Sequence, residues 1–273
     1  MKASHRIIGI AITALITVGL VVFSIEYDWM GPLIDNNNSQ IDDVYKALMV
    51  ASIPFFMIIV GMLGYILLEF RAKPEDPDDK DGAPFHGSTK IEVIWTIIPA
   101  IVVLSLGIYA WRVLDNVEAA KPNSMTIKVI GQQFAWNYQY PEQGIKTGGD
   151  LVVPVNRPLY FEMTSADVIH SFYVPATRMK RDVADGFTTR LRFEPNKTGR
   201  YPIVCAELCG VGHATMRSTL RVVTQPEFDA WVKLQKSDKA SKPTGANTDP
   251  ETWPGAYGGD TPSAVGGADH EKN

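Results

Sequence analysis

Cysteine is scarce in this sequence: 273 residues contain only two, both within the stretch YPIVCAELCGVGHATM at 201–216. One disulfide is therefore the most that these cysteines could form within the chain. A C-x-x-C-H motif is missing, which excludes the usual attachment of a c-type haem. Basic stripes with interleaved aromatic residues are also missing, and the formal net charge is −4, so nucleic acid is not an expected partner.

Charge is absent from three long runs, which are Ile7–Ile25, Ala47–Leu68 and Val93–Trp111. About 20 apolar residues suffice for a helix to cross a membrane. The second and third runs therefore predict transmembrane helices over 46–70 and 93–112. Pro54 and Pro99 are compatible with this, because membrane helices tolerate proline.

The first run, within residues 1–25, has two interpretations. Lys2 and Arg6 precede its apolar core, as in a cleaved signal peptide. The core is long, however, and FSIEYDWMG after it contains no small-x-small cleavage site. We favour a retained transmembrane helix and keep the signal peptide as the alternative.

Lysine and arginine also differ between the loops. Segment 24–45 has none, whereas segment 70–92 has four: Arg71, Lys73, Lys80 and Lys90. The excess of positive charge predicts that loop 71–92 is cytoplasmic. Everything after about residue 113 then lies outside. We expect a multi-pass protein of a bacterial-type plasma membrane, with its soluble domain on the extracytoplasmic side, where disulfides are permitted.

The soluble part, 122–235, reads as an all-β domain closed by a helix. Seven or so short runs rich in Val, Ile, Thr and aromatic residues alternate with turn formers over 125–223, which predicts an antiparallel sandwich or barrel. Thr224 and Glu227 have capping-box spacing, ahead of Phe228, Trp231 and Leu234 at helical spacing. Residues 236–273 are rich in Gly, Pro, Ser and charge and are predicted to be disordered.

The two cysteines stand among other soft donors. A disulfide is the simplest interpretation, but it has no use for His213 four residues after Cys209, or for Met216. His170 is the only other histidine of the domain, and thiolates, imidazoles and a thioether together select copper. Zinc would leave Met216 unused. Since thiolate sulfur can bridge, Cys205 and Cys209 could hold two coppers with one histidine each, and this two-copper centre uses every donor.

The motif resembles a known family. CAELCGVGHATM matches the C-x-E-x-C-x3-H-x2-M signature of cytochrome c oxidase subunit II. The segments DVIHSFYVP, HGSTKIEVIWTIIPAIV and GQQFAWNYQYP are similar to other parts of that family, in the family's order from about residue 45 to 235. The resemblance implies an N-terminal transmembrane helical hairpin, here with an extra N-terminal helix, followed by an all-β cupredoxin-like sandwich.

The same resemblance implies the electron-accepting subunit of a respiratory terminal oxidase. Such a subunit takes electrons from cytochrome c at a binuclear copper A centre and passes them to haem in subunit I, where oxygen is reduced to water. Expected partners are subunit I, further oxidase subunits, cytochrome c and the membrane, with no haem in this chain. A membrane-anchored copper chaperone is the alternative, but chaperones of that kind place the histidine far downstream on a thioredoxin-like fold. A quinol oxidase subunit would lack the copper ligands.

Family positions imply a role for each ligand. Copper would be bound by the side chains of five residues and by the backbone carbonyl of a sixth: His170, Cys205, Cys209, His213 and Met216, with Glu207 giving the carbonyl. The Glu207 side chain would help hold magnesium at the contact with subunit I, or would be a solvated surface charge. Glu92 would lie at the entrance of a proton path, or be a simple charge at a helix end.

Period two places four aromatic residues on one face of a strand: Phe134, Trp136, Tyr138 and Tyr140. The family resemblance makes this face the surface at which electrons enter from cytochrome c; ordinary sheet packing is the alternative. The family has tryptophan at the position of Phe134, so this chain departs there and Trp136 is the nearest indole. Asp167 and Asp182 match acids near the docking face.

Overall fold

The computed structural model describes residues 3–35, 37–71, 84 and 86–237, and these form two compact units. The first unit contains helices α1 (Ala3–Glu26), α2 (Ser39–Glu69) and α3 (Thr89–Glu118). The second contains the strands, helix α4 (Gln225–Lys236) and a short segment from between α1 and α2. The described residues exclude Lys73 and Lys80. They also exclude 238–273, which is nearly all of the tail 236–273 that was predicted to be disordered.

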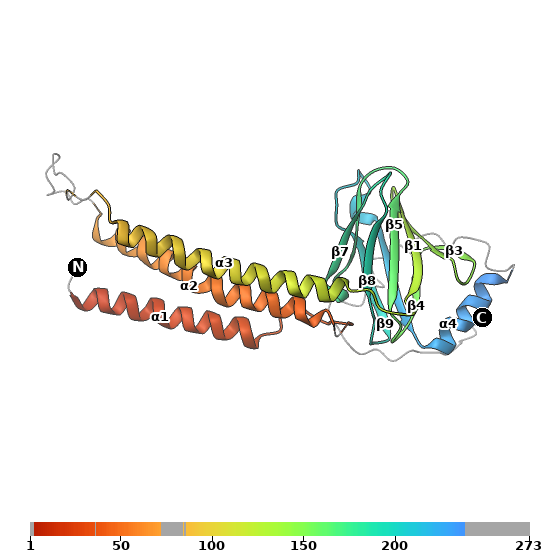
Figure 1. Ribbon diagram of the computed structural model, residues 1–273, viewed down its shortest axis with the longest axis horizontal. Coiled ribbons are helices and arrows are strands. Elements are labelled where there is room, and N and C mark those ends of the chain that lie inside the picture. Colours follow the sequence, from red (N-terminus) through yellow and green to blue (C-terminus); the bar gives the residue numbers. More distant parts are fainter. Residues whose placement is uncertain (1–2, 36, 72–83, 85, 238–273) are drawn as a thin grey trace, which may run out of the picture. The chain divides into compact units, whose positions relative to one another are not determined.

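All three N-terminal helices are long and apolar enough to cross a membrane (Figure 1). Helix α1 packs against α2, and α2 against α3. A Cβ atom on Gly61 would lie 3.0 Å from the Thr13 methyl carbon, so the small residue lets α1 and α2 approach closely. Arg6 and Glu69 form an ion pair at 3.3 Å between the same helices. Helix α2 begins at Ser39, ahead of the predicted 46, and α3 continues to Glu118.

The soluble unit is a sandwich of two five-stranded sheets (Figure 1). The first sheet has the order β3-β2-β1-β5-β8, with bounds Ile145–Gly148, Ala135–Tyr140, Met125–Gln132, Leu159–Ser165 and Thr189–Phe193. The second has the order β4-β10-β9-β6-β7, with bounds Leu151–Pro154, Arg217–Val223, Gly199–Cys205, His170–Val174 and Met179–Val183. Helices followed by an all-β sandwich confirm the predicted fold class.

The prediction of a purely antiparallel arrangement was wrong for two pairs of strands. β1 pairs with β5 in parallel, and so do β4 and β10, which makes both sheets mixed. The described residues also form ten strands, where about seven were predicted. The alternation of apolar and polar residues shows which face of a strand is buried but not which strand lies beside it, so the sequence pattern could not give this order.

Aromatic side chains fill the space between the sheets. Phe161 on β5 stacks on Phe193 at 4.9 Å between ring centroids and lies 6.1 Å from Phe172 on the opposite sheet. The Tyr138 hydroxyl is 2.9 Å from that of Ser218 and so links β2 to β10. Burial raises the pKa of the Tyr138 hydroxyl, so the link stays neutral at any physiological pH.

Helix α4 closes the domain as predicted. The Glu227 carboxylate accepts hydrogen bonds from the Thr224 backbone N–H at 2.8 Å and from the Thr224 hydroxyl at 2.7 Å, which confirms the capping box. Phe228 is buried, and Trp231 packs edge-on against Tyr140 at 5.2 Å. Leu234 is exposed, so the packed stripe of the helix is shorter than predicted.

The loop between α1 and α2 contributes to the sandwich. We call residues 31–35 the strap. Its Ile34 has no exposed surface, and the Ile34 N–H donates to the carbonyl of Ala176 at 3.0 Å. The Ile34 carbonyl accepts from the Asn196 N–H at 2.7 Å. Ala176 follows β6 and Asn196 follows β8, so the strap links the two sheets.

Candidate metal centre

The metal-ligating motif is a loop whose two ends are held together. Strand β9 ends at Cys205, and β10, its antiparallel partner, begins at Arg217. The Cys205 N–H donates to the Met216 carbonyl at 3.1 Å and closes the loop between them. His170 is the first residue of β6, which pairs with β9 through Phe172 and Cys205. Sheet pairing thus brings a histidine 35 residues upstream to the loop.

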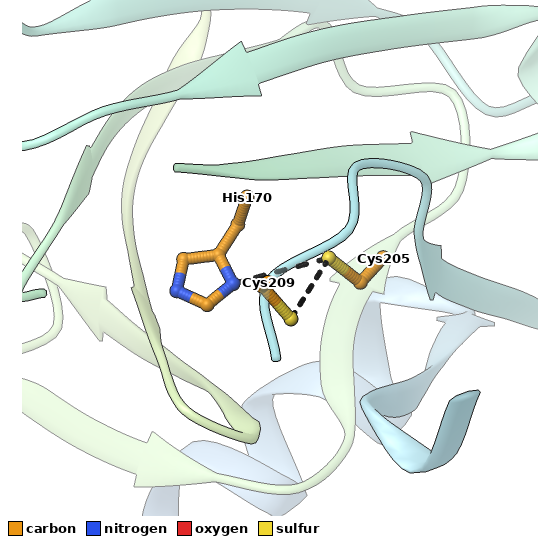
Figure 2. Close-up of side chains that lie close together, drawn as sticks. All are labelled: His170, Cys205 and Cys209. Carbon is orange, nitrogen blue, oxygen red and sulfur yellow. Dashed lines mark hydrogen bonds between the residues drawn. The ribbon is translucent and has the colours of Figure 1, made fainter. Parts of the chain in front are cut away.

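Three side chains form the centre of the cluster (Figure 2). The sulfur atoms of Cys205 and Cys209 lie 3.8 Å apart, and His170 Nδ1 is 3.9 Å from the Cys205 sulfur. The ligand atoms of all three lie within 4.8 Å of one another. Both cysteines are free, because a disulfide would need the sulfur atoms at about 2.05 Å.

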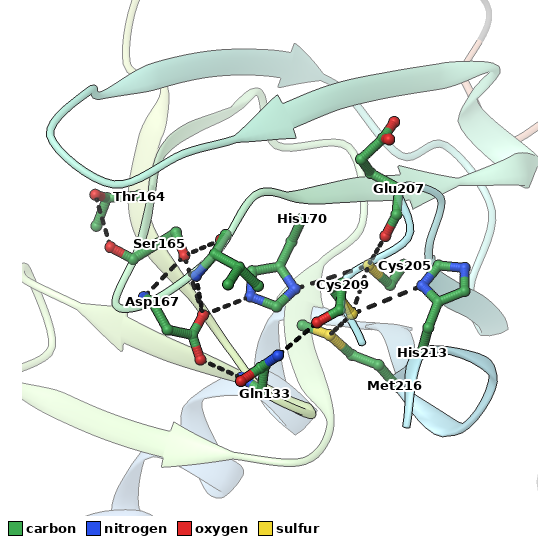
Figure 3. Close-up of polar contacts among 11 residues, drawn as sticks. Gln133, Thr164, Ser165, Asp167, His170, Cys205, Glu207, Cys209, His213 and Met216 are labelled. Carbon is green, nitrogen blue, oxygen red and sulfur yellow. Dashed lines mark hydrogen bonds and ion pairs between the residues drawn. The ribbon is translucent and has the colours of Figure 1, made fainter. Parts of the chain in front are cut away.

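The remaining predicted ligands surround the same two sulfur atoms (Figure 3). His213 Nδ1 and the Met216 sulfur each lie 3.7 Å from the Cys209 sulfur. The Glu207 carbonyl oxygen is 3.2 Å from the Cys205 sulfur. The structure therefore brings together all six residues that the family resemblance implied, with one imidazole beside each thiol.

These separations fit a shared metal centre. Metal–sulfur and metal–nitrogen bonds are about 2.3 Å and about 2.0 Å long, so a sulfur and a nitrogen on one ion stand at most about 4.3 Å apart. Both thiol–imidazole distances, 3.9 and 3.7 Å, satisfy this limit. Two sulfurs bridging the same ions can be about 4.6 Å apart at most, and here the distance is 3.8 Å.

The cluster is largely closed to water. His170 and Met216 have no exposed surface, and the two cysteines are buried. Burial, reinforced by the neighbouring Cys205, raises the pKa of the Cys209 thiol to about 11. Without metal this thiol is protonated at neutral pH, so metal binding must displace its proton and is weakened by acid.

An aspartate orients His170. The Asp167 carboxylate lies 2.8 Å from His170 Nε2, which leaves Nδ1 directed at the Cys205 sulfur (Figure 3). Burial would raise the pKa of Asp167, but hydrogen bonds from the Gln133 backbone N–H and from His170 hold it at about 2. The D-x-x-H spacing was visible in the sequence, yet Asp167 was interpreted only as a docking-face acid.

Gly131 leaves room for that histidine. A Cβ atom at this position would lie 2.9 Å from His170 Cδ2 and 3.2 Å from the Trp136 ring. Real side chains do not approach so closely. Gly131 is thus part of the site, although sequence reasoning did not single it out.

The aromatic residues of β2 are internal. Trp136, Tyr138 and Tyr140 are all buried, so ordinary sheet packing accounts for them. Trp136 lies edge-on to His170 at 5.9 Å, beneath the surface. Phe134, just before β2, is half-buried, and its ring lies against the metal loop: a Cβ atom on Gly212 would be 2.5 Å from Phe134 Cδ2.

Comparisons with known proteins identify the family. The family model for the transmembrane domain of cytochrome c oxidase subunit II matches residues 33–113, and the model for its periplasmic domain matches 144–223. A probable cytochrome c oxidase subunit 2 of Rickettsia bellii is 30% identical over 214 residues, covering 71% of this chain and 78% of the relative. The chain belongs to the cytochrome c oxidase subunit II family.

The chain is also similar to other subunit II proteins. Cytochrome c oxidase subunit 2 of a Synechocystis species is 29% identical over 279 residues, covering 85% of this chain and 83% of the relative. Among solved structures, the periplasmic domain of subunit II of Bradyrhizobium japonicum is 34% identical, covering 43% of this chain and 97% of that domain, with a TM-score of 0.42. A second solved structure is a mixed disulfide intermediate between a thioredoxin-like protein and subunit II of cytochrome c oxidase. The match is 33% identical and covers 44% of this chain and 95% of the matched chain, with a TM-score of 0.40.

Membership of the subunit II family indicates which metal the cluster binds. The sandwich is a copper-binding, cupredoxin-like domain of this family, and the cluster of His170, Cys205 and Cys209 is its candidate copper site. The chain is a membrane protein with a soluble domain and a subunit of an oxidoreductase complex, cytochrome c oxidase.

Two further carboxylates of this subunit II chain are exposed. Glu207 lies in the metal loop with its side chain directed away from the thiols (Figure 3). Glu92 accepts the Ser88 backbone N–H at 3.3 Å at the start of α3. An acidic side chain that accepts a backbone N–H at the start of a helix is typical of helix N-termini, and it is consistent with Glu92 as a charge at a helix end.

Proposed function

We propose that this chain is the electron-accepting subunit of a respiratory terminal oxidase, with a centre of two copper ions. Electrons would arrive from cytochrome c and leave to a haem of subunit I, where oxygen is reduced to water. The observation that carries the proposal is the pair of buried thiols 3.8 Å apart, with one imidazole beside each. A zinc site could use the two thiols and the two imidazoles but would leave Met216 unused, and a disulfide would leave both imidazoles and the thioether unused.

Each residue has a distinct part in holding the metal. Cys205 and Cys209 would bridge the two ions, His170 and His213 would each bind one, and Met216 with the Glu207 carbonyl would complete the set. The bound copper pair would supply a one-electron carrier.

The test is copper binding by the full-length chain in detergent. It should bind two coppers and, when oxidised, show an electron paramagnetic resonance signal of one electron shared by both. Cys205→Ser or Cys209→Ser should abolish the shared signal, because a bridge is lost. Met216→Leu should retain both coppers and shift the potential, since a thioether is a weak axial ligand. A colourless protein with one Cu(I) would favour the chaperone alternative.

Glu207 would also hold magnesium at the contact with subunit I. Glu207 is exposed, and its side chain points away from the thiols, where it could meet ligands of a partner chain (Figure 3). Glu207→Gln should leave copper in place, because the backbone carbonyl survives, and lower the magnesium content of the assembled oxidase. Unchanged magnesium on metal analysis would make Glu207 a plain surface charge.

Electrons would enter through Phe134 rather than through direct contact with Trp136. Phe134 is half-buried against the metal loop, whereas the Trp136 indole is only 2% exposed. Phe134→Ala should therefore slow oxidation of cytochrome c with copper content intact. An unaltered rate would place the contact elsewhere on the domain.

The copper domain would lie on the extracytoplasmic side of a bacterial-type plasma membrane, with α1 retained. The Lys/Arg asymmetry supports the orientation, and the packing of α1 on α2 supports retention. Reporter fusions after residues 80 and 237 should behave as cytoplasmic and exported. N-terminal sequencing of the mature protein tests retention of α1. A start near residue 26 would refute it.

A further inference from the structure

We infer that Gln133 is a positioning residue that couples the two halves of the metal centre. It lies in the turn between β1 and β2, outside the ligand set, and reaches one ligand through its side chain and another through its backbone (Figure 3). The inference rests on the proposed copper function. It adds a residue that sets the geometry of the bound metal.

The side chain of Gln133 holds the thiol half. Its Nε2 donates to the Cys209 carbonyl oxygen at 2.5 Å. The carbonyl belongs to the residue whose sulfur lies within 3.8 Å of the sulfur atoms of Cys205 and Met216. Fixing this peptide plane fixes the direction in which the Cys209 side chain leaves the backbone.

The backbone of Gln133 holds the imidazole half. Its N–H donates to one oxygen of the Asp167 carboxylate at 2.7 Å, and the other oxygen lies 2.8 Å from His170 Nε2. The β1–β2 turn holds the carboxylate in place, and the carboxylate then sets the plane of the imidazole. One residue therefore connects the outer partner of His170 with the backbone of Cys209.

The metal loop leaves space for this contact. Gly210 has φ of +133°, a backbone conformation that favours glycine. A Cβ atom there would lie 2.8 Å from Gln133 Nε2 and 3.2 Å from the Phe134 ring. A side chain at 210 would displace the Gln133 carboxamide from this position. The turn and the loop are thus fitted to each other, and a displacement of the turn would move a thiolate and an imidazole together.

The test is Gln133→Leu in the full-length, copper-loaded chain, which removes the side-chain donor but keeps the backbone N–H to Asp167. Loss of an outer partner typically costs 10–100-fold in metal affinity. We expect release of copper to a Cu(I) chelator to be about tenfold faster. The copper hyperfine splitting in the paramagnetic resonance spectrum should also change. Gln132→Leu is the matched control, because Gln132 is exposed and its side chain makes no hydrogen bond to the metal loop in the described structure.

Each outcome decides the question. If the wild-type chain binds two coppers with a shared electron, and Gln133→Leu matches it in both release rate and hyperfine splitting, the inference is wrong and the proposed function stands. If the wild-type chain binds no copper, the proposed function fails first. If the Leu variant does not fold, Gln133→Asn keeps the carboxamide but is too short to reach the Cys209 carbonyl. It should change both measurements in the same direction, and wild-type values for it would overturn the inference.

Discussion

At the scale of single residues, the site depends on a missing side chain as much as on its ligands. A Cβ atom on Gly131 would lie only 2.9 Å from His170 Cδ2. The φ of Gly131 is not positive, so alanine would fit the backbone and would disturb only the packing.

Gly131→Ala should therefore shift the His170 ring and weaken copper binding by about 10–100-fold, the usual effect of disturbing a ligand's support. Gly148→Ala is the matched control in the same sheet, because a Cβ atom there would meet only Asn137 Oδ1, at 3.4 Å. Competition with a copper chelator measures both variants. Equal affinities would show that His170 adjusts without cost.

The clustering of these donors could be predicted from the sequence, but the contacts that support the cluster could not. Five of the six proposed ligands lie within twelve residues, and a loop between adjacent strands brings them together by chain connectivity alone. Asp167 and Gln133 act through contacts between separate loops, 34 residues apart. Only the folded structure shows that the same carboxylate meets a backbone N–H and an imidazole.

At the scale of elements, local signals predicted helices and caps well. The three apolar runs became helices, and Thr224 with Glu227 formed the capping box. The identity of neighbouring strands was not predictable, because the parallel pairs β1–β5 and β4–β10 join segments that no local pattern relates.

The cap of α4 should depend on pH. Hydrogen bonds from the Thr224 backbone N–H and hydroxyl lower the pKa of Glu227. A carboxyl with a lowered pKa stabilises the folded state above its unfolded pKa of about 4.3, and this contribution is lost as the pH falls through the folded value. Protection of the α4 amides against hydrogen exchange should fall in that range.

Glu227→Gln provides the comparison for this pH dependence, because the side chain keeps an oxygen acceptor at the capping position and does not titrate. The difference in protection between the wild-type chain and the variant should shrink as the pH falls below about 4. A constant difference from pH 7 to 3 would mean that the carboxylate charge does not stabilise this cap.

At the scale of the whole molecule, the strap makes the soluble unit discontinuous in sequence. The copper domain predicted from the sequence, residues 122–235, does not include the strap. Arg178 donates to the carbonyl oxygens of Gly31 at 2.8 Å and Pro32 at 3.1 Å, and Asp35 accepts the Glu194 N–H at 2.6 Å. A polar loop between two apolar runs gave no signal of this contact, because Ile34 is the only apolar residue of the strap that is buried.

Ile34→Ala should therefore destabilise the sandwich rather than the helices. Removing a fully buried isoleucine side chain typically costs about 2–5 kcal/mol, through lost burial and the cavity left behind. Leu234→Ala is the control, since Leu234 is 59% exposed on α4 and should change stability by less than about 0.5 kcal/mol. Hydrogen exchange of the β6 and β9 amides in the full chain measures the free energy of unfolding of the sandwich. If both variants exchange like the wild type, the strap lies on the domain without supporting it, and a fragment beginning at residue 121 would be as stable as the domain in the intact chain.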